Sequence, residues 1–180
     1  MSGVERLQSL KLVIFDVDGV FTDGRTWQDT SGVWRRYFSV RDTMGIRALR
    51  KAGYKIAVVT TETSEEVRAH MAFVGVDEFA DACFDKALTI TELLAKYDVD
   101  ANGAAYMSAD ACDIDLFETI GFGATVPTAR TELQRAARFV TSRAGGDGAV
   151  LEICNYILQN AQHTRRGLAS SAQDPSVASL

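Results

Sequence analysis

The chain has 180 residues, of which 47% are hydrophobic and 24% are charged, and it contains only 2 prolines. This balance is typical of one compact domain with a buried core, and it excludes a chain that is disordered throughout. With 19 Lys and Arg against 24 Asp and Glu, the formal net charge is -5, which excludes a bulk attraction to nucleic acid or to anionic membranes.

The apolar runs and the cysteines indicate the cellular compartment. No apolar run approaches the roughly 20 residues that a membrane-spanning helix needs, so we expect neither a membrane span nor a secretion signal. The three cysteines, Cys83, Cys112 and Cys154, lack the spacing of a zinc site. They are typical of reduced thiols in a cytoplasmic protein, which is the localisation that we expect.

Short apolar runs alternate with segments of helical periodicity. The first run, 12–15, is unbroken and predicts a strand that is buried on both faces. Residues 20–40 carry aromatic and β-branched stretches on either side of an Asp-Thr-Ser-Gly turn, which predicts a β-hairpin. Further strands are predicted at 56–59, 79–84, 104–107, 123–126 and 139–141. Helices are predicted at about 44–52, 64–73, 86–94, 113–120, 128–137 and 150–158. Residues 163–180 lack periodicity, so we expect a tail that is disordered or lies on a partner.

This order predicts an α/β fold, a doubly wound, parallel, Rossmann-like sheet with helices on both faces, in one domain over residues 1–162. Ligands of such folds bind at the carboxyl ends of the strands. Polar residues follow three of the predicted strands at that edge. They are Asp16 and Asp18, Thr60 and Thr61, and Asp110 and Asp113.

Asp16 and Asp18 lie two residues apart where the first strand ends, and Gly19 lets the chain turn sharply beside a ligand. Converging carboxylates repel each other unless a cation joins them, and Mg²⁺ prefers carboxylate and phosphate oxygens. One carboxylate can then attack phosphorus while the other handles the proton of the leaving alcohol. Taken alone, an Asp-Xaa-Asp sequence is more often ordinary turn chemistry, so the interpretation depends on its surroundings.

Two residues supply that context. Thr60 ends a second buried strand, where its hydroxyl can donate to a phosphoryl oxygen, and Lys86 begins a helix and can bring a positive charge to the same anion. In this order the chain resembles the haloacid dehalogenase-like phosphohydrolase superfamily. The resemblance covers about residues 10–160 and is to the cap-less branch that dephosphorylates 3-deoxy-octulosonate 8-phosphate and nine-carbon, sialic-acid-type sugar 9-phosphates. The motifs that carry it are residues 16–24 (DVDGVFTDG), Val40-Arg41-Asp42, Asp85-Lys86 and residues 145–152 (GGDGAVLE).

The resemblance implies a role for each residue at this edge. Asp16 is the nucleophile that forms an aspartyl-phosphate, and Asp18 is the general acid and base, whose backbone carbonyl also binds Mg²⁺. Thr60, Thr61 and Lys86 bind the phosphate. The implied metal ligands are Asp16, Asp18, Asp110 and Asp113. The branch also implies an inserted hairpin without a large cap domain, and a homotetramer in which each hairpin packs on neighbouring subunits and helps to close an adjacent active site.

Two positions depart from the family pattern. The acidic loop usually reads Gly-Asp-Asp-Xaa-Xaa-Asp, but residues 108–113 read Ser-Ala-Asp-Ala-Cys-Asp, so Ala109 stands where an acid binds Mg²⁺. Asp110 is then the candidate to take over that duty, and Mg²⁺ binding should be weakened. The octulosonate phosphatases usually have Thr-Gly-Arg where this chain has Thr60-Thr61-Glu62. Glu62 reverses the local charge, so we expect it to contact the substrate and to favour the sialic-acid-type members.

The sequence therefore predicts a Mg²⁺-dependent phosphatase of a small sugar phosphate, of the nonulosonate or octulosonate type of 2-keto-3-deoxy acid. The alternative is a catalytically weak or inactive phosphatase-like oligomerisation module, similar to the C-terminal domain of some sialic-acid cytidylyltransferases, and Ala109 favours it. A response-regulator receiver also uses acids at strand ends, but a long hairpin after Asp18 does not suit it.

Three remaining features have structural explanations. The aromatic residues of the hairpin indicate a subunit interface more simply than a sugar-binding platform; they are Trp27, Trp34, Tyr37 and Phe38. His70 is typical of a surface or interface position rather than of a catalytic base. Residues 145–148 are interpreted as a turn, with an active-site rim as the alternative that the family suggests.

Overall fold

The computed structural model describes the backbone of residues 7–171 and the side chains of residues 7–161. Its centre is a six-stranded sheet in the order β5-β4-β1-β6-β7-β8, and every ladder in it is parallel. The strands are β1 (Leu12–Phe15), β4 (Lys55–Val59), β5 (Glu78–Ala80), β6 (Ala104–Met107), β7 (Phe122–Thr125) and β8 (Phe139–Val140). The predicted doubly wound α/β fold is confirmed.

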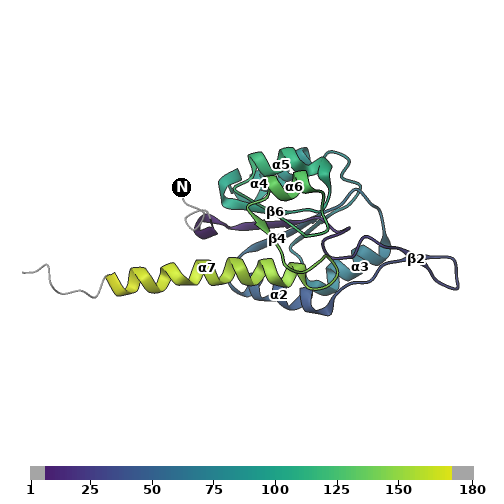
Figure 1. The fold of residues 1–180 in the computed structure, drawn as a ribbon, viewed down its shortest axis with the longest axis horizontal. Coiled ribbons are helices and arrows are strands. Elements are labelled where there is room, and N and C mark those ends of the chain that lie inside the picture. Colours follow the sequence, from purple (N-terminus) through teal and green to yellow (C-terminus); the bar gives the residue numbers. More distant parts are fainter. Residues whose placement is uncertain (1–6, 172–180) are drawn as a thin grey trace, which may run out of the picture.

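Helices cover both faces of the sheet (Figure 1). One face carries α2 (Val40–Lys51), α3 (Glu65–Val74) and α7 (Ala149–Ser171); the other carries α4 (Lys86–Tyr97), α5 (Ile114–Thr119) and α6 (Thr131–Ala136). The sequence of strand β1 is apolar without interruption because both faces of the strand are buried. Val13 and Phe15 belong to the core under the first face, whereas Leu12 and Ile14 belong to the core under the second.

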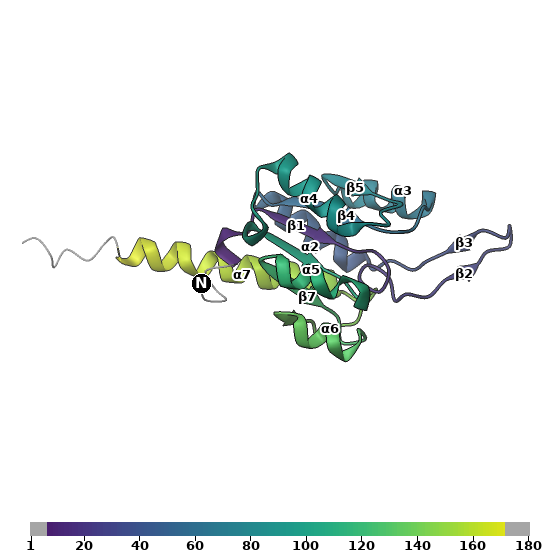
Figure 2. The same cartoon turned by 90° about the horizontal axis from the view of Figure 1, so that it is seen from above.

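A hairpin leaves the body after β1. Strands β2 (Trp27–Gln28) and β3 (Trp34–Arg35) pair antiparallel over two residues each, and the hairpin projects from one end of the molecule while α7 projects from the other (Figure 2). Asp29 closes the turn, because its Oδ1 accepts hydrogen bonds from the amides of Ser31 and Val33. The predicted hairpin at 20–40 is confirmed in place, with a shorter ladder than its aromatic content indicated.

Several boundaries differ from the sequence predictions: α2 begins at Val40 rather than at about residue 44, β5 ends at Ala80 rather than at residue 84, and α6 begins at Thr131 rather than at residue 128. Residues 111–113 form a short 3₁₀ helix, η2 (Ala111–Asp113), which leads into α5, so helical structure begins two residues before the predicted helix at 113–120. The backbone of α7 continues through residues 163–171, where a tail without structure was predicted; residues 172–180 lie outside the described residues. Arg165, Arg166, Leu168 and Ala169 in this segment have high helix propensity, so the loss of apolar periodicity did not end the helix. Among the described helices, none is long and apolar enough to span a membrane.

Asp42 joins α2 to the start of α7. It is 1% exposed, and its Oδ1 accepts a hydrogen bond of 2.9 Å from the amide of Leu151. Its Oδ2 has no hydrogen-bond partner among the described residues. Burial raises the pKa of Asp42 from 3.8 to about 6, and the amides of Leu151 and Val150 oppose that rise only in part.

This buried carboxyl predicts a pH dependence of stability. Because the pKa of Asp42 is raised from 3.8 to about 6 on folding, the folded state binds more protons than the unfolded state between these values. The free energy of unfolding should fall as the pH rises across this window and level off above it. Asp42→Asn keeps an acceptor for Leu151 and should remove that fall, which is on the order of 2–3 kcal/mol. Urea unfolding at a series of pH values measures it, with the exposed Asp115→Asn as control. Equal pH profiles for wild type and Asp42→Asn would contradict the assignment.

Candidate active site

Strands β4, β1 and β6 lie side by side, so their carboxyl ends meet at one edge of the sheet. Asp16 follows β1, Thr60 follows β4 and Ser108 follows β6, and all three are buried. The topology thus brings together residues that are far apart in the sequence; of these, Asp16 and Thr60 were predicted to lie at this edge and Ser108 was not.

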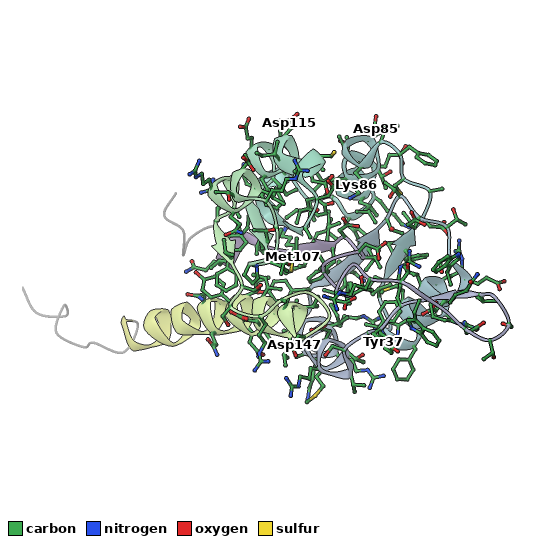
Figure 3. The ribbon with its side chains drawn as sticks, turned by 45° about the vertical axis from the view of Figure 1, so that its right-hand side comes forward. Tyr37, Asp85, Lys86, Met107, Asp115 and Asp147 are labelled. Atoms are coloured by element: carbon green, nitrogen blue, oxygen red, sulfur yellow. The ribbon has the colours of Figure 1, made fainter. Side chains whose placement is uncertain are left out.

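A buried ion cluster occupies this edge. The Nζ of Lys86 lies 2.8 Å from Oδ2 of Asp16 and 2.8 Å from Oδ2 of Asp113. Two hydroxyls complete the shell of Asp113, because Tyr106 and Ser108 donate to its Oδ2 at 2.7 and 2.6 Å. Lys86 reaches the cluster from the first residue of α4 and lies in the interior, whereas its neighbour Asp85 lies at the outer surface (Figure 3). The second oxygen of Asp16, Oδ1, accepts from the amide of Val17 at 2.7 Å.

Burial and charge set the proton affinities of this cluster. Burial raises the pKa of Asp16, and the adjacent Lys86 ammonium offsets this only in part. Burial alone would lower the pKa of Lys86, but the carboxylates of Asp16 and Asp113 outweigh it and raise that pKa. Burial, with both carboxylates, also raises the pKa of Tyr106 well above its ordinary value, so its hydroxyl stays a donor. Lys86 therefore remains a cation beside the nucleophile candidate.

Asp18 has separate partners. Its Oδ1 accepts hydrogen bonds from Nε of Arg36 at 2.9 Å and from Oγ1 of Thr22 at 3.1 Å, and its Oδ2 lies 3.3 Å from Nη2 of Arg36. The guanidinium of Arg36 also lies 3.8 Å from Oε2 of Glu62. The two carboxylates of the Asp-Xaa-Asp motif are thus held by different cations, Asp16 by Lys86 and Asp18 by Arg36.

The segment after β4 places its three candidates differently. Thr60 is 2% exposed, and its Oγ1 accepts a hydrogen bond of 3.2 Å from the amide of Glu62. Thr61 is exposed and lines a cavity of about 500 Å³ together with Lys86, Asp110 and Asp113. The side chain of Glu62 is 58% exposed and faces Arg36. Thr60 therefore shapes the turn, while Thr61 and Glu62 face open space.

The two acids of the acidic loop, Asp110 and Asp113, have different surroundings. Asp113 belongs to the buried cluster, whereas Asp110 is exposed and its Oδ1 accepts from the amide of Cys112 at the start of η2. Asp110 nevertheless lines a cavity of about 480 Å³ with Asp18 and Ala109. A Cβ built on Gly19 would lie 2.7 Å from Cβ of Ala109, so the side chain at 109 points at the loop that follows β1.

These donors fit a hard divalent cation that keeps most of its waters. No group of three His, Cys, Asp or Glu side chains within the described part of the chain converges as a complete metal site. Mg²⁺ sites in phosphate-processing enzymes use only one or two carboxylates, with waters and substrate phosphate. The carboxylates of Asp16 and Asp110 and the backbone carbonyl of Asp18 are oxygen donors of the kind that such a site uses.

Glycines let a second loop pack against the candidate nucleophile loop. A Cβ built on Gly145 would lie 1.9 Å from the carbonyl oxygen of Gly19, and the amide of Gly146 donates to the carbonyl of Val20 at 3.2 Å. The turn at 145–148 thus lies directly on the loop after β1, which favours the rim interpretation over an unrelated turn.

Sequence reasoning missed three residues of this region: Arg36, Tyr106 and Ser108. Tyr106 lies in an apolar strand, and Ser108 was noted only as the first residue of the acidic loop. His70 stacks on Phe38, with ring centroids 3.9 Å apart, and burial lowers its pKa. It contacts none of the carboxylates described above.

Comparisons with known proteins agree with this geometry. The 3-deoxy-D-manno-octulosonate 8-phosphate phosphatase KdsC of Escherichia coli K12 is 30% identical over 155 residues, which cover 86% of this chain and 82% of that protein. Its namesake in Haemophilus influenzae is 34% identical over 155 residues, covering 86% of each. The Moraxella catarrhalis phosphatase of the same name, solved with magnesium, phosphate and KDO, has a TM-score of 0.85 at 27% identity and covers 93% of this chain and 96% of its own. No family model matches the chain.

Proposed function

Because the chain belongs to the 3-deoxy-D-manno-octulosonate 8-phosphate phosphatase family, a cap-less family of the haloacid dehalogenase-like superfamily, we propose that it is a Mg²⁺-dependent phosphatase of a sugar phosphate. The observation that carries the proposal is the position of Asp16. It lies at the end of the central strand, buried, with one oxygen 2.8 Å from the Lys86 ammonium and the other on the Val17 amide.

In the mechanism that we propose, an oxygen of Asp16 attacks phosphorus and forms an aspartyl-phosphate while the bond from phosphorus to the sugar oxygen breaks. Asp18 gives its proton to that leaving oxygen. Water then attacks the phosphorus and gives a proton to Asp18, which releases inorganic phosphate and restores the carboxylate of Asp16. Thr60, Thr61 and Lys86 hold the phosphoryl oxygens. Bound Mg²⁺ would neutralise part of the negative charge of the phosphate and the carboxylates. Its proposed ligands are Asp16, Asp18 and Asp110, together with Asp113, which shares the Lys86 ammonium with Asp16.

The proposed substrate is a 2-keto-3-deoxy acid sugar phosphate, of the octulosonate type that names the relatives or of the nonulosonate type. Glu62 supports a difference from the octulosonate phosphatases, because it places a 58% exposed carboxylate next to Thr61 in the chain, 3.8 Å from the guanidinium of Arg36. A phosphate-release screen over both classes of sugar phosphate, with and without Mg²⁺, tests the proposal.

A non-catalytic role as an oligomerisation module is the second candidate, and Ala109 favours it. The methyl group of Ala109 points at the loop after β1, where a carboxylate would add charge to the cation site. Loss of that carboxylate weakens the site whichever role the chain has.

The nucleophile assignment predicts that Asp16→Asn abolishes phosphate release, since the amide keeps the shape but is a poor nucleophile. Turnover should fall by about 10³-fold or more. The matched control is Asp98→Asn, an exposed position at the far end of α4 with a φ of 53° that asparagine tolerates. Undiminished turnover of Asp16→Asn in a coupled phosphate assay would remove Asp16 from the mechanism.

The acidic loop predicts that Ala109→Asp lowers the Mg²⁺ concentration for half-maximal activity by roughly tenfold, whereas Asp110→Asn raises it. The control is Ala111→Asp, which adds the same charge to the same cavity without occupying the position beside Gly19. Calorimetric titration with Mg²⁺ gives the affinities directly. If wild type and Ala109→Asp are both inactive on every sugar phosphate, the oligomerisation module becomes the better interpretation.

We also propose that the chain forms a homotetramer through its hairpin. The hairpin leaves Trp27, Trp34 and Tyr37 exposed at 41%, 59% and 66%. Exposed aromatic side chains gathered on one hairpin are typical of a surface that binds another protein. Light scattering at micromolar concentration should give the tetramer for wild type and smaller species for Trp34→Glu. The control for added surface charge is Leu88→Glu, because Leu88 lies on α4 and is 57% exposed. A monomeric wild type would contradict the proposal.

A further inference from the structure

Arg36 is the residue through which the hairpin contacts the candidate active site. Its side chain is 8% exposed, although the residues on either side of it, Arg35 and Tyr37, face the solvent to a greater extent. Within that buried position the guanidinium meets two acids, Asp18 and Glu62. Nε and Nη2 reach the two oxygens of Asp18 at 2.9 and 3.3 Å, and Nη2 lies 3.8 Å from Glu62.

The backbone of Arg36 is held as well. Its amide donates to Oε1 of Glu66 at 3.0 Å, which attaches the hairpin to the first turn of α3. The other oxygen of Glu66, Oε2, is buried and has no hydrogen-bond partner among the described residues. A buried carboxylate oxygen without a donor is costly, and the charge of the Arg36 guanidinium offsets part of that cost.

We propose that Arg36 is a positioning residue that fixes the carboxylate of Asp18 for proton transfer, and that Glu62 and Glu66 fix Arg36 in turn. The inference rests on the proposed function for the role of Asp18 and on the distances above for the contact. A guanidinium that meets both oxygens of a carboxylate sets its orientation as well as its charge environment, which an ammonium does not do.

The contacts also assign different duties to the two oxygens of Asp18. Oδ1 accepts from both Arg36 and Thr22, whereas Oδ2 has the single contact of 3.3 Å in the part of the chain that the structure describes. A carboxylate oxygen has about two acceptor positions. We therefore infer that Oδ1 is the anchored oxygen and that Oδ2 exchanges the proton with the sugar oxygen and with water.

The experiment compares two substrates that differ in how much the leaving group needs a proton. The sugar alkoxide of 3-deoxy-D-manno-octulosonate 8-phosphate needs one, whereas the nitrophenolate of p-nitrophenyl phosphate hardly does. Arg36→Met should lower kcat on the sugar phosphate by about tenfold or more and on p-nitrophenyl phosphate by less than about threefold. Arg36→Lys keeps the charge but loses the two-point contact, so it should show a smaller loss of the same kind.

The matched control is Arg35→Met. Arg35 is the preceding residue of the hairpin and pairs with Asp29 at 2.9 Å, away from Asp18. It should leave the ratio of the two kcat values unchanged. An equal loss on both substrates in Arg36→Met would indicate a merely structural role, and no loss on either would show that Asp18 does not depend on Arg36; both results overturn the inference.

A measurement without catalysis separates this inference from the proposed function. In a double-mutant cycle of Arg36→Met and Asp18→Asn by urea unfolding, the stability loss of the double variant should be smaller than the sum of the two single losses. Additive losses would overturn the contact. If wild type hydrolyses neither these two substrates nor any nonulosonate phosphate while the losses are non-additive, the proposed function fails and the anchoring of Asp18 by Arg36 stands.

Discussion

The sharing of one ammonium by two buried carboxylates is the interaction on which the site depends. Asp16 and Asp113 place two carboxylates where their side chains are only 8% and 7% exposed, and Lys86 supplies the one positive charge between them. Burying a charge without a partner costs several kcal/mol, so this arrangement requires adjacent strands that deliver the partners accurately. The parallel pairing of β1 with β6 and the entry of α4 from the other face meet that requirement.

This cluster keeps a formal charge of -1, from two carboxylates and one ammonium. A phosphate ester that enters adds further negative charge at short range, where repulsion in a low-dielectric site is strong. The single positive charge of Lys86 does not offset the two carboxylates and the phosphate ester together. The electrostatics therefore call for a second source of positive charge at the open side, and that is the side on which Asp18, Ala109 and Asp110 line a cavity. The demand for a divalent cation follows from the charges already fixed by the fold.

How much of this was predictable depends on the range of the interactions. The strands and their ends follow from local patterns, and the rule that ligands bind at carboxyl ends brings Asp16, Thr60 and the acidic loop to one place. Tyr106 was missed because an apolar strand gives no sign that one ring carries a hydroxyl toward Asp113. Arg36 was missed because its contact with Asp18 spans 18 residues and depends on the path of the hairpin, which no periodicity encodes. The roles assigned to these residues stay predictions.

The hairpin has side chains on an inner side, toward Asp18, and on an outer, exposed side, and this links the proposed assembly to the proposed chemistry. In an extended segment successive side chains point to opposite sides, so Arg36 turns inward to Asp18 while Tyr37 stands 66% exposed and stacks on Trp27 with ring centroids 5.8 Å apart. A subunit that packs on the outer aromatics therefore restrains the same backbone that carries the guanidinium. Glu66 fixes that backbone from the inner side at 3.0 Å. In the proposed tetramer, a contact outside the active site would therefore limit the positions open to the anchored oxygen of Asp18. No residue of the neighbouring subunit would need to touch Asp18.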